Sequence, residues 1–115
     1  VQGNCPQEGT YTNVFTVVDN CGNVSTQYTQ VISVVDNQGP QWTTQPGDLN
    51  VTVNCDDTQA LADAQALEPV ATDNCDNTLT PQKSTGTFNT GDCPQAGTYV
   101  NTWTVTDDCG NSTVC

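Results

Sequence analysis

Seven cysteines are the residues with the clearest capacity for covalent chemistry in this chain of 115 residues. Their spacing does not fit a zinc site, because the sequence contains no C-x-x-C pair and no histidine to complete a ligand set. Cysteines at this density in a short chain are typical of disulfide frameworks, which persist in oxidising compartments. We therefore expect an extracellular protein that is held together by disulfide bonds.

Oxygen-bearing side chains dominate the ionisable residues. Thirteen Asp and Glu residues accompany a single cation, Lys83, and give a formal net charge of -12. Such a surface repels nucleic acid and anionic membranes, since both are bound through Lys and Arg. It suits hard cations such as Ca²⁺, which take oxygen ligands. The alternative is that the carboxylates form a solvated surface that keeps the protein soluble.

Catalytic side chains are scarce. The sequence has no His and no Arg, and no Ser or Cys nucleophile with a base beside it, so only carboxylate pairs remain. Asp56-Asp57 and Asp107-Asp108 are adjacent in sequence, and in an extended chain their side chains point to opposite faces. We expect no enzyme activity. No apolar run is long enough to span a bilayer, so we also expect no membrane insertion.

An internal repeat of 88 residues organises these side chains. The segment from Cys5 to Asn23 aligns with the segment from Cys93 to Asn111, and 13 of the 19 positions are identical. The alignment places CPQEGTY beside CPQAGTY and DNCGN beside DDCGN. Two copies of one unit in a single chain indicate a tandem array of small domains.

The phase of the repeat predicts the domain boundaries. Residues 1–37 correspond to the C-terminal part of one repeat, residues 38–48 to a linker and strand lead-in, and residues 49–115 to a second repeat that lacks its last strand. Gly39-Pro40 marks the boundary, because Pro ends strand pairing and Gly permits a turn. A sheet without its last strand has an open edge, which a neighbouring segment or another copy must cover.

Short strands separated by turns account for most of the sequence. Thr, Val and aromatic residues alternate with period two, which favours a pleated, half-buried surface. The predicted strands lie at 49–55, 66–73, 78–88, 98–106 and after residue 111. Only TQALADAQAL at 58–67 has a helical pattern, and we expect a short helical turn or a loop there. Because there is no βαβ alternation, we predict an all-β fold, an immunoglobulin-like β-sandwich in tandem repeats that are stapled by disulfides.

Alternating strand directions predict which cysteines meet. In an antiparallel arrangement, Cys55 and Cys93 lie at one end of the sandwich, and Cys75 and Cys109 lie at the other. A straight strand at 98–106 spans roughly 30 Å, whereas a disulfide needs Cα atoms about 5.5–6 Å apart. Cys93 therefore does not reach Cys109. We predict the bridges Cys55–Cys93 and Cys75–Cys109, each worth roughly 4 kcal/mol in the chain-entropy model.

The other three cysteines have no predicted partner within the chain. By the same logic, Cys5 and Cys21 would pair with cysteines upstream of this segment. Cys115 has no counterpart, because Gln27 occupies the equivalent position in the first copy. It is either free or bonded to something outside the segment.

Asp and Asn residues gather at the predicted end that holds Cys75 and Cys109. The linker leaves the far end of the preceding repeat and must pass this surface. Ca²⁺ would neutralise the converging oxygens and stiffen the joint between repeats. The alternative is that these residues form Asx-turns at strand ends. The candidate calcium ligands are Asp36, Asn37, Asp73, Asp76, Asp107, Asp108 and Asn111.

Two motifs carry a resemblance to a known family. ATDNCD at 71–76 and WTVTDDCGN at 103–111 resemble the HYR and HYR-like repeats, and the resemblance covers the whole chain. These repeats are immunoglobulin-like modules that occur in tandem in large exported adhesins and surface proteins, particularly of Bacteroidota. The resemblance implies adhesion, or a stalk or filament, at a cell surface, and it brings no catalytic residues. The chain departs from a complete module in its phase.

We therefore expect a structural repeat of an extracellular surface adhesin, stalk or filament, with neighbouring copies or repeats of the same protein as partners. The alternative is a glycan- or surface-binding adhesin module. Such a module would use the Thr face of Thr102, Thr104 and Thr106, or an exposed Trp42. Thr residues with period two more often lie on the wet face of a sheet, and a Trp near a Pro more often caps a core.

Overall fold

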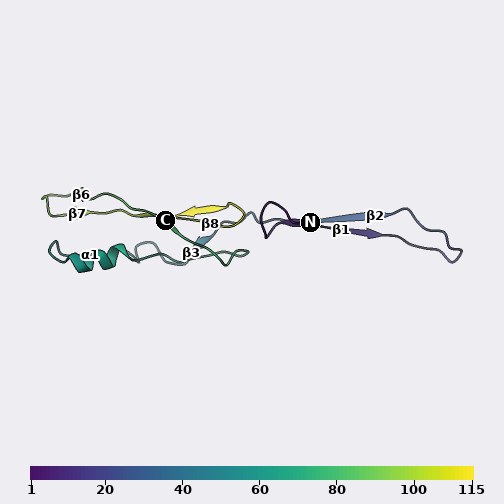
Figure 1. Cartoon of the computed structure of the whole chain (residues 1–115), viewed down its shortest axis with the longest axis horizontal. Coiled ribbons are helices and arrows are strands. Elements are labelled where there is room, and N and C mark those ends of the chain that lie inside the picture. Colours follow the sequence, from purple (N-terminus) through teal and green to yellow (C-terminus); the bar gives the residue numbers. More distant parts are fainter.

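The chain forms an extended rod. The computed structural model describes residues 1–115 and measures 93 × 17 × 17 Å along its principal axes, with a Cα radius of gyration of 25.7 Å. A compact domain of this length would have a radius of gyration of about 13 Å. Two units placed end to end account for the difference, and the N-terminus lies near the place where they meet (Figure 1).

The first unit is a hairpin of two antiparallel strands, β1 (Gly9–Phe15) and β2 (Tyr28–Val34). Its register runs from Gly9 opposite Val34 to Phe15 opposite Tyr28. Thr, Val and aromatic residues fill both strands and favour this conformation. The segment between the strands forms one end of the rod (Figure 1).

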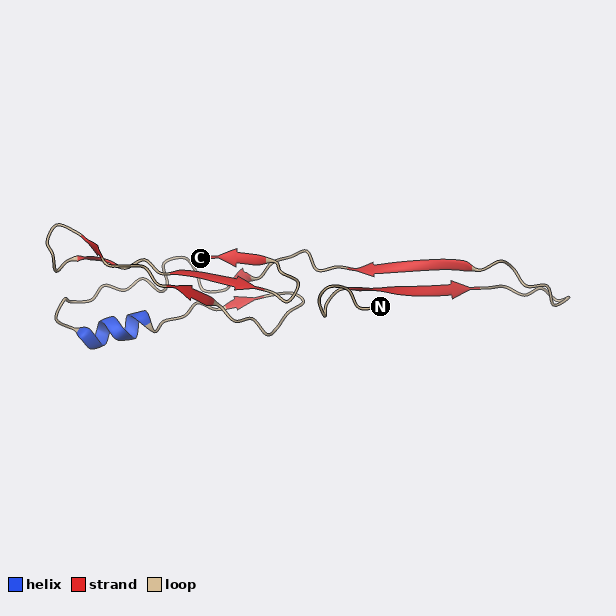
Figure 2. Cartoon of the chain, turned by 45° about the horizontal axis from the view of Figure 1, so that its top comes forward, coloured by secondary structure: helices blue, strands red, loops and turns tan.

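Three small antiparallel sheets and one helix make up the second unit. The elements are β3 (Gln41–Trp42), α1 (Thr58–Gln65), β4 (Ala71–Thr72), β5 (Gln82–Ser84), β6 (Asn89–Thr90), β7 (Gly97–Thr98), β8 (Thr102–Thr106) and β9 (Ser112–Val114). Strand β3 pairs with β4, β6 pairs with β7, and the three-stranded sheet has the order β5-β8-β9. The β6–β7 hairpin lies at the outer end of this unit, beside the helix (Figure 2).

Strand β8 supplies the centre of the second unit. Trp103 is 8% exposed and Val105 is fully buried, whereas Thr102 and Thr106 on the opposite face are exposed. Lys83 of β5 lies over the Trp103 ring, with Nζ 5.8 Å from the ring centroid. The alternation predicted for this strand therefore separates a buried face from a wet one.

The equivalent residues of the first unit are open to solvent. Phe15 aligns with Trp103 and Val17 aligns with Val105, but Phe15 is 55% exposed and Val17 is 69% exposed. The hairpin thus presents apolar side chains that no other part of this chain covers.

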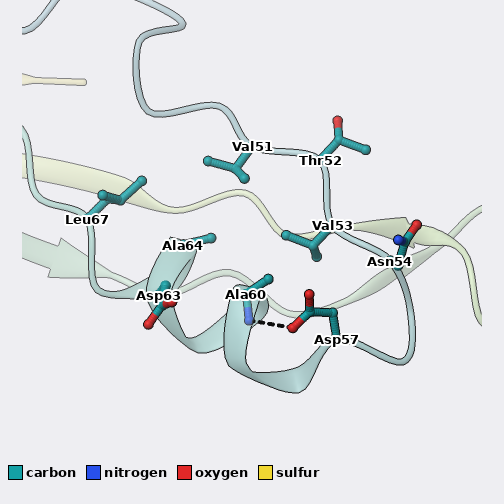
Figure 3. Close-up of a pocket in the computed structure, with 9 residues that line it drawn as sticks. All are labelled: Val51, Thr52, Val53, Asn54, Asp57, Ala60, Asp63, Ala64 and Leu67. Atoms are coloured by element: carbon teal, nitrogen blue, oxygen red, sulfur yellow. Dashed lines mark hydrogen bonds between the residues drawn. The ribbon is translucent and has the colours of Figure 1, made fainter.

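Where the sequence predicted a short helical turn or a loop at 58–67, the structure has the helix α1. Asp57 caps it, because one of its carboxylate oxygens accepts the Ala60 N–H at 2.9 Å. Val51 and Val53 of the preceding segment line a groove together with Ala60 and Ala64 of the helix (Figure 3). No helix of the structure has the length and apolar character needed to cross a membrane.

Several predicted strands are shorter than expected. No strand forms at 49–55, where the hydrophobic alternation faces α1 instead of a partner strand. Within 66–73 only β4 forms as a strand, because the segment begins at the end of α1, where the Ala66 and Leu67 N–H groups donate to Ala62 and Ala64 of the helix.

The strands predicted at 78–88 and 98–106 are also interrupted. Only β5 forms within the first of these segments, and the second is divided into β7 and β8. Asn101 lies in the gap, and its side-chain oxygen accepts the Gly86 N–H at 3.2 Å. A side chain thus takes the place of a ladder bond. The all-β class is confirmed, and the immunoglobulin-like sandwich stays a prediction.

Candidate functional site

A disulfide bond joins the two units. Cys5 and Cys109 are bonded, with Cα atoms 5.0 Å apart and a sequence separation of 104. Cys5 precedes β1 and is buried, and Cys109 lies in the turn between β8 and β9. We call this region the joint and define it as residues 5–8, 36–39, 73–76 and 107–111.

The structure replaces the predicted bridges. Cys109 is bonded to Cys5 and not to Cys75, and Cys55 and Cys93 are both unbonded. The prediction assumed that each unit is closed by its own bridges. In the structure, the turn between β8 and β9 in the second unit meets the start of the hairpin in the first unit, so Cys109 bonds to Cys5. The upstream partner predicted for Cys5 is corrected for the same reason. The unbonded cysteines are Cys21, Cys55, Cys75, Cys93 and Cys115.

Asp107 closes the turn that presents Cys109. Its Oδ1 accepts the N–H groups of Cys109 and Asn111, each at 2.9 Å, and its Oδ2 accepts Nδ2 of Asn111 at 2.9 Å. Gly110 completes the turn with a φ of 90°, which glycine adopts without strain. Burial acts to raise the pKa of Asp107, but the hydrogen bonds from Asn111 and from the neighbouring backbone outweigh it and lower that pKa. Asp107 is therefore held as a carboxylate.

Three carboxylates converge at the joint. Asp36 lies in the segment between β2 and β3, residues 35–40, which we call the linker from here on; Asp73 follows β4 and Asp107 follows β8. One carboxylate oxygen from each lies within 4.8 Å of the others. Asp36 and Asp107 are buried, at 6% and 5% exposed. Residues far apart in the sequence thus place negative charge from the linker and from the second unit at one point.

Two of these carboxylates have an oxygen with no donor. The Oδ2 atoms of Asp36 and Asp73 are buried and accept no hydrogen bond. The Oδ1 of Asp73 accepts the N–H groups of Cys75 and Asp76, each at 2.9 Å. A buried carboxylate oxygen without a partner is costly, because it has left water and gained nothing in return.

No basic side chain compensates the cluster. The single cationic side chain, Lys83, donates to the main-chain oxygen of Gln65 at 2.6 Å, at the end of α1. The pKa of the neighbouring Cys75 thiol is raised, first by loss of contact with water and then by the negative charges of Asp36, Asp73 and Asp107. The joint therefore holds three acidic groups without a protein counter-ion.

This donor set fits Ca²⁺. The ion takes oxygen ligands at about 2.3–2.6 Å, so two oxygens on one ion lie at most about 5 Å apart. The separations among the three carboxylates meet this limit. The two oxygens that lack donors would gain a partner of the correct charge. Asp36, Asp73 and Asp107 are the residues that would hold the ion.

The other predicted ligands have different positions. Asp76 is buried, but its Oδ1 accepts both the N–H and the hydroxyl of Thr78, and its Oδ2 accepts the Asp108 N–H at 3.0 Å. These bonds, those from Thr78 above all, lower the pKa of Asp76. Asp108 contributes only its backbone to this contact. Asp76 therefore links the turn after β4 to the turn after β8.

Asn111 and Asn37 also lie at the joint without belonging to the group of three carboxylates. The Asn111 amide donates from Nδ2 to the main-chain oxygen of Asp36 at 3.2 Å as well as to Asp107. It therefore positions the linker and the turn. Asn37 is exposed, and its side chain makes no hydrogen bond.

The sequence did not single out Gln7 and Glu8. A Glu8 oxygen accepts the Asp36 N–H at 3.4 Å, and one lies within 4.8 Å of the bonded sulfurs of Cys5 and Cys109. Gln7 contacts the Cys109 sulfur, with Oε1 at 3.6 Å. The available signal was position: the two residues lie two and three positions after Cys5, in a turn whose sequence recurs around Cys93. At the equivalent of Glu8, the second copy has Ala96.

The groove beside α1 is lined mainly by apolar side chains. It encloses about 390 Å³ and contains two carboxylates, Asp57 and Asp63 (Figure 3). Asp57 caps the helix, and Asp63 accepts Nε2 of Gln59 at 2.8 Å. Because both carboxylates are engaged in local hydrogen bonds, the groove offers packing for the helix and no pair of groups for acid–base chemistry.

The side chains expected for glycan binding do not form one flat exposed face. Trp42 is half-buried, and its indole N–H is buried without an acceptor. Thr104 is half-buried, while Thr106 shares a hydrogen bond of 2.7 Å with Ser112. The joint is therefore the stronger candidate site.

Comparison with known proteins identifies the second unit. A family model described as an HYR-like domain with four cysteines matches residues 43–114, which is more than half of the chain. The chain belongs to this family of HYR-like domains. Neither a curated protein nor a solved structure gave a match. The resemblance seen in the sequence is thus confirmed.

HYR-like domains are extracellular modules of the adhesion type and are not catalytic. The four cysteines within the matched residues are Cys55, Cys75, Cys93 and Cys109. In this HYR-like domain, Cys109 is the one that bonds outside the matched region.

Proposed function

We propose that the chain is a structural repeat of an extracellular surface stalk or filament, in which HYR-like units are joined end to end. The observation that carries this proposal is the joint, where Cys5 of one unit is bonded to Cys109 of the next. The rod of 93 × 17 × 17 Å supports it, because the two units extend along one axis. A disulfide at the contact limits how far the units separate.

Ca²⁺ is the second element of this proposal. Asp36 belongs to the linker, whereas Asp73 and Asp107 belong to the second unit, so an ion bound to all three would fix the linker against that unit. Without the ion, the mutual repulsion of the three carboxylates opposes the same contact. The proposed work of the protein is thus to hold a fixed spacing, and it requires no catalytic step.

Small-angle X-ray scattering on the full chain tests this proposal. In Ca²⁺ we expect a maximum dimension near that of the structure, 93 Å. In EDTA we expect a broader distribution of shorter distances, because the linker is released, and added Ca²⁺ restores the original profile. Calorimetric titration with Ca²⁺ gives the stoichiometry, which should be about one ion per joint.

A compact particle in both buffers would overturn the stalk. An extended particle that binds no Ca²⁺ and has the same profile in EDTA would overturn the calcium joint while leaving the stalk in place. Equal heats with Mg²⁺ and Ca²⁺ would point to nonspecific screening, because Mg²⁺ requires a stricter octahedral site.

A further inference from the structure

Two cysteines of the chain recur at the 88-residue shift, and the Cys5–Cys109 bond uses one copy of each. Cys5 is equivalent to Cys93, and Cys21 is equivalent to Cys109, both at the 88-residue shift. The bond joins the first type, Cys5, to the second type, Cys109, in the neighbouring unit. Cys93 and Cys21 remain, one of each type, and both are exposed.

The two unbonded members lie at opposite ends of the rod. Cys93 belongs to the turn between β6 and β7, which forms one end (Figure 1). Cys21 belongs to the segment between β1 and β2, which forms the other end (Figure 1). In a row of such units, the end with Cys93 would face an end with Cys21, as the base of the first hairpin faces Cys109 in the joint.

The turn around Cys93 has the same backbone bonds as the turn around Cys5. The Ala96 N–H donates to the Cys93 oxygen at 3.1 Å, and the Glu8 N–H donates to the Cys5 oxygen at 3.1 Å. Residues Gly91 and Gly3 repeat the match: the Gly91 N–H donates to Ala96 at 2.6 Å, and the Gly3 N–H donates to Glu8 at 2.7 Å. Cys93 is therefore presented by a turn that already has the shape of a bonded one.

The turn around Cys21 likewise matches the turn around Cys109. Asp19 accepts the N–H groups of Cys21 and Asn23 at 2.9 Å and the Asn23 amide at 2.8 Å. Asp107 makes the same three contacts. The glycines that follow the cysteines, Gly22 and Gly110, have φ values of 85° and 90°. The turns around Cys93 and Cys21 thus already have the backbone shape of the two bonded turns, although neither cysteine is bonded in this chain.

We propose that Cys93 bonds to the cysteine equivalent to Cys109 in one neighbouring unit, and that Cys21 bonds to the cysteine equivalent to Cys5 in the other. The same bridge as Cys5–Cys109 would then recur between successive HYR-like units. The partner is another repeat of the same kind, so the inference deepens the end-to-end function and rests on it. The bond forms when two thiols transfer two electrons and two protons to glutathione disulfide, which leaves as two molecules of reduced glutathione. Cys93 then has no role as a partner of Cys55.

The test uses the full chain followed by a second copy of residues 28–115. Cys115 occupies the position of Gln27, so this fusion continues the 88-residue register. After equilibration in a buffer of reduced and oxidised glutathione, peptide mapping without reduction should find two bridges: Cys5 with the first Cys109, and Cys93 with Cys109 of the appended copy. A bond from Cys93 to Cys55, or a free Cys93 thiol beside an intact Cys5–Cys109 bond, would overturn the proposal.

A pair of variants in the same fusion chain gives a second reading. Cys93→Ser should free the thiol of the appended Cys109 and leave Cys5–Cys109 intact, so alkylation labels one additional thiol. Cys115→Ser is the matched control, because this cysteine is also exposed and unbonded, and it should change neither bridge. If the appended Cys109 stays bonded in Cys93→Ser, the inference is wrong.

The two proposals fail in different ways. Absence of the Cys5–Cys109 bond would remove the basis of the end-to-end function itself. Presence of that bond with Cys93 bonded elsewhere would leave the stalk standing and remove only the recurring bridge.

Discussion

The side-chain amide of Asn111 donates to the main-chain oxygen of Asp36 at 3.2 Å and so ties the turn after β8 to the linker after β2. Asn23 is its equivalent in the first unit. It donates to Asp19 at 2.8 Å, as Asn111 donates to Asp107 at 2.9 Å, but it contacts no linker residue. Comparing substitutions of the two asparagines therefore distinguishes what the amide contributes to the turn from what it contributes to the joint.

Replacing this amide should loosen the joint. We expect Asn111→Ala to lower the free energy of unfolding by about 1–3 kcal/mol, because it leaves the Asp36 oxygen and the Asp107 carboxylate short of a donor. Asn23→Ala should cost less, since its turn is exposed. Urea denaturation of both variants measures the difference. Equal losses would show that the contact with Asp36 contributes nothing beyond the turn.

Removing the bridge should separate the units. In Cys5→Ser, the chain-entropy model predicts a loss of about 4–5 kcal/mol for a closed loop of this size. Scattering should also show a wider range of inter-unit distances. Cys21→Ser is the control, because Cys21 is exposed and unbonded in this chain. A Cys5→Ser variant with the stability and scattering of Cys21→Ser would contradict the assigned role of the bond.

Removing one carboxylate should abolish most of the stabilisation that Ca²⁺ gives. In EDTA, Asp36→Asn should leave the melting temperature unchanged or raise it, since a repulsive contact of about 1–3 kcal/mol is relieved. In Ca²⁺ the same variant should lose most of the rise that the ion gives to the original chain. Calorimetric scans in both buffers make the measurement.

Asp92→Asn is the matched control for that experiment. Asp92 is exposed, lies between β6 and β7, and makes no side-chain hydrogen bond. It should retain the full response to Ca²⁺. If Asp36→Asn responds to Ca²⁺ as strongly as Asp92→Asn does, the proposed calcium site is wrong.

Acid should weaken the fold only at low pH. The pKa values of Asp19, Asp76 and Asp107 are all lowered from the ordinary value of 3.8. A carboxyl with a lowered pKa in the folded state adds stability that is fully present above its unfolded pKa and is lost as the pH falls through its folded pKa. In EDTA, the melting temperature should therefore stay level down to about pH 5 and fall below pH 4. Asp76→Asn should make this fall shallower, and a main loss above pH 5 would contradict the assignment.

Truncating the centre of β8 should cost far more than the same change in the hairpin. Val105 is fully buried and Val17, its equivalent, is 69% exposed. Val105→Ala should lower the free energy of unfolding by about 2 kcal/mol, through lost burial and the cavity that remains. Val17→Ala should stay within about 0.5 kcal/mol. Similar losses for the two would show that the hairpin is covered in solution.

Local signals predicted the elements that depend on neighbours in sequence. The helix over 58–67 formed as α1 because Asp57 supplies its cap and Ala, Leu and Gln favour its interior. The alternation at 49–55 predicted a strand, but no strand forms there, and Val51 and Val53 line the groove beside that helix. Period two shows that one side of a segment is buried and does not show what covers it.

The pairing of cysteines depended on information that one unit does not contain. Antiparallel directions placed Cys75 and Cys109 at one end of the second unit, and the same logic predicted a partner for Cys5 upstream of this segment. The choice between Cys75 and Cys5 rests on how the linker docks. The bond between Asn111 and Asp36 belongs to that docking, and no propensity scale describes it. Asp36, Asp73 and Asp107 were within reach of prediction because each follows a paired segment.

The position of the Cys5–Cys109 bond decides where tension travels when the chain is pulled by its ends. Force that enters at Val1 crosses from Cys5 to Cys109 through the sulfurs and leaves through the last residues before Cys115. The 104 residues of sequence separation, about 350 Å of fully extended chain, bear none of it. Once a reducing agent breaks the bond, the tension passes to this segment, and the hidden length becomes available as its paired strands open.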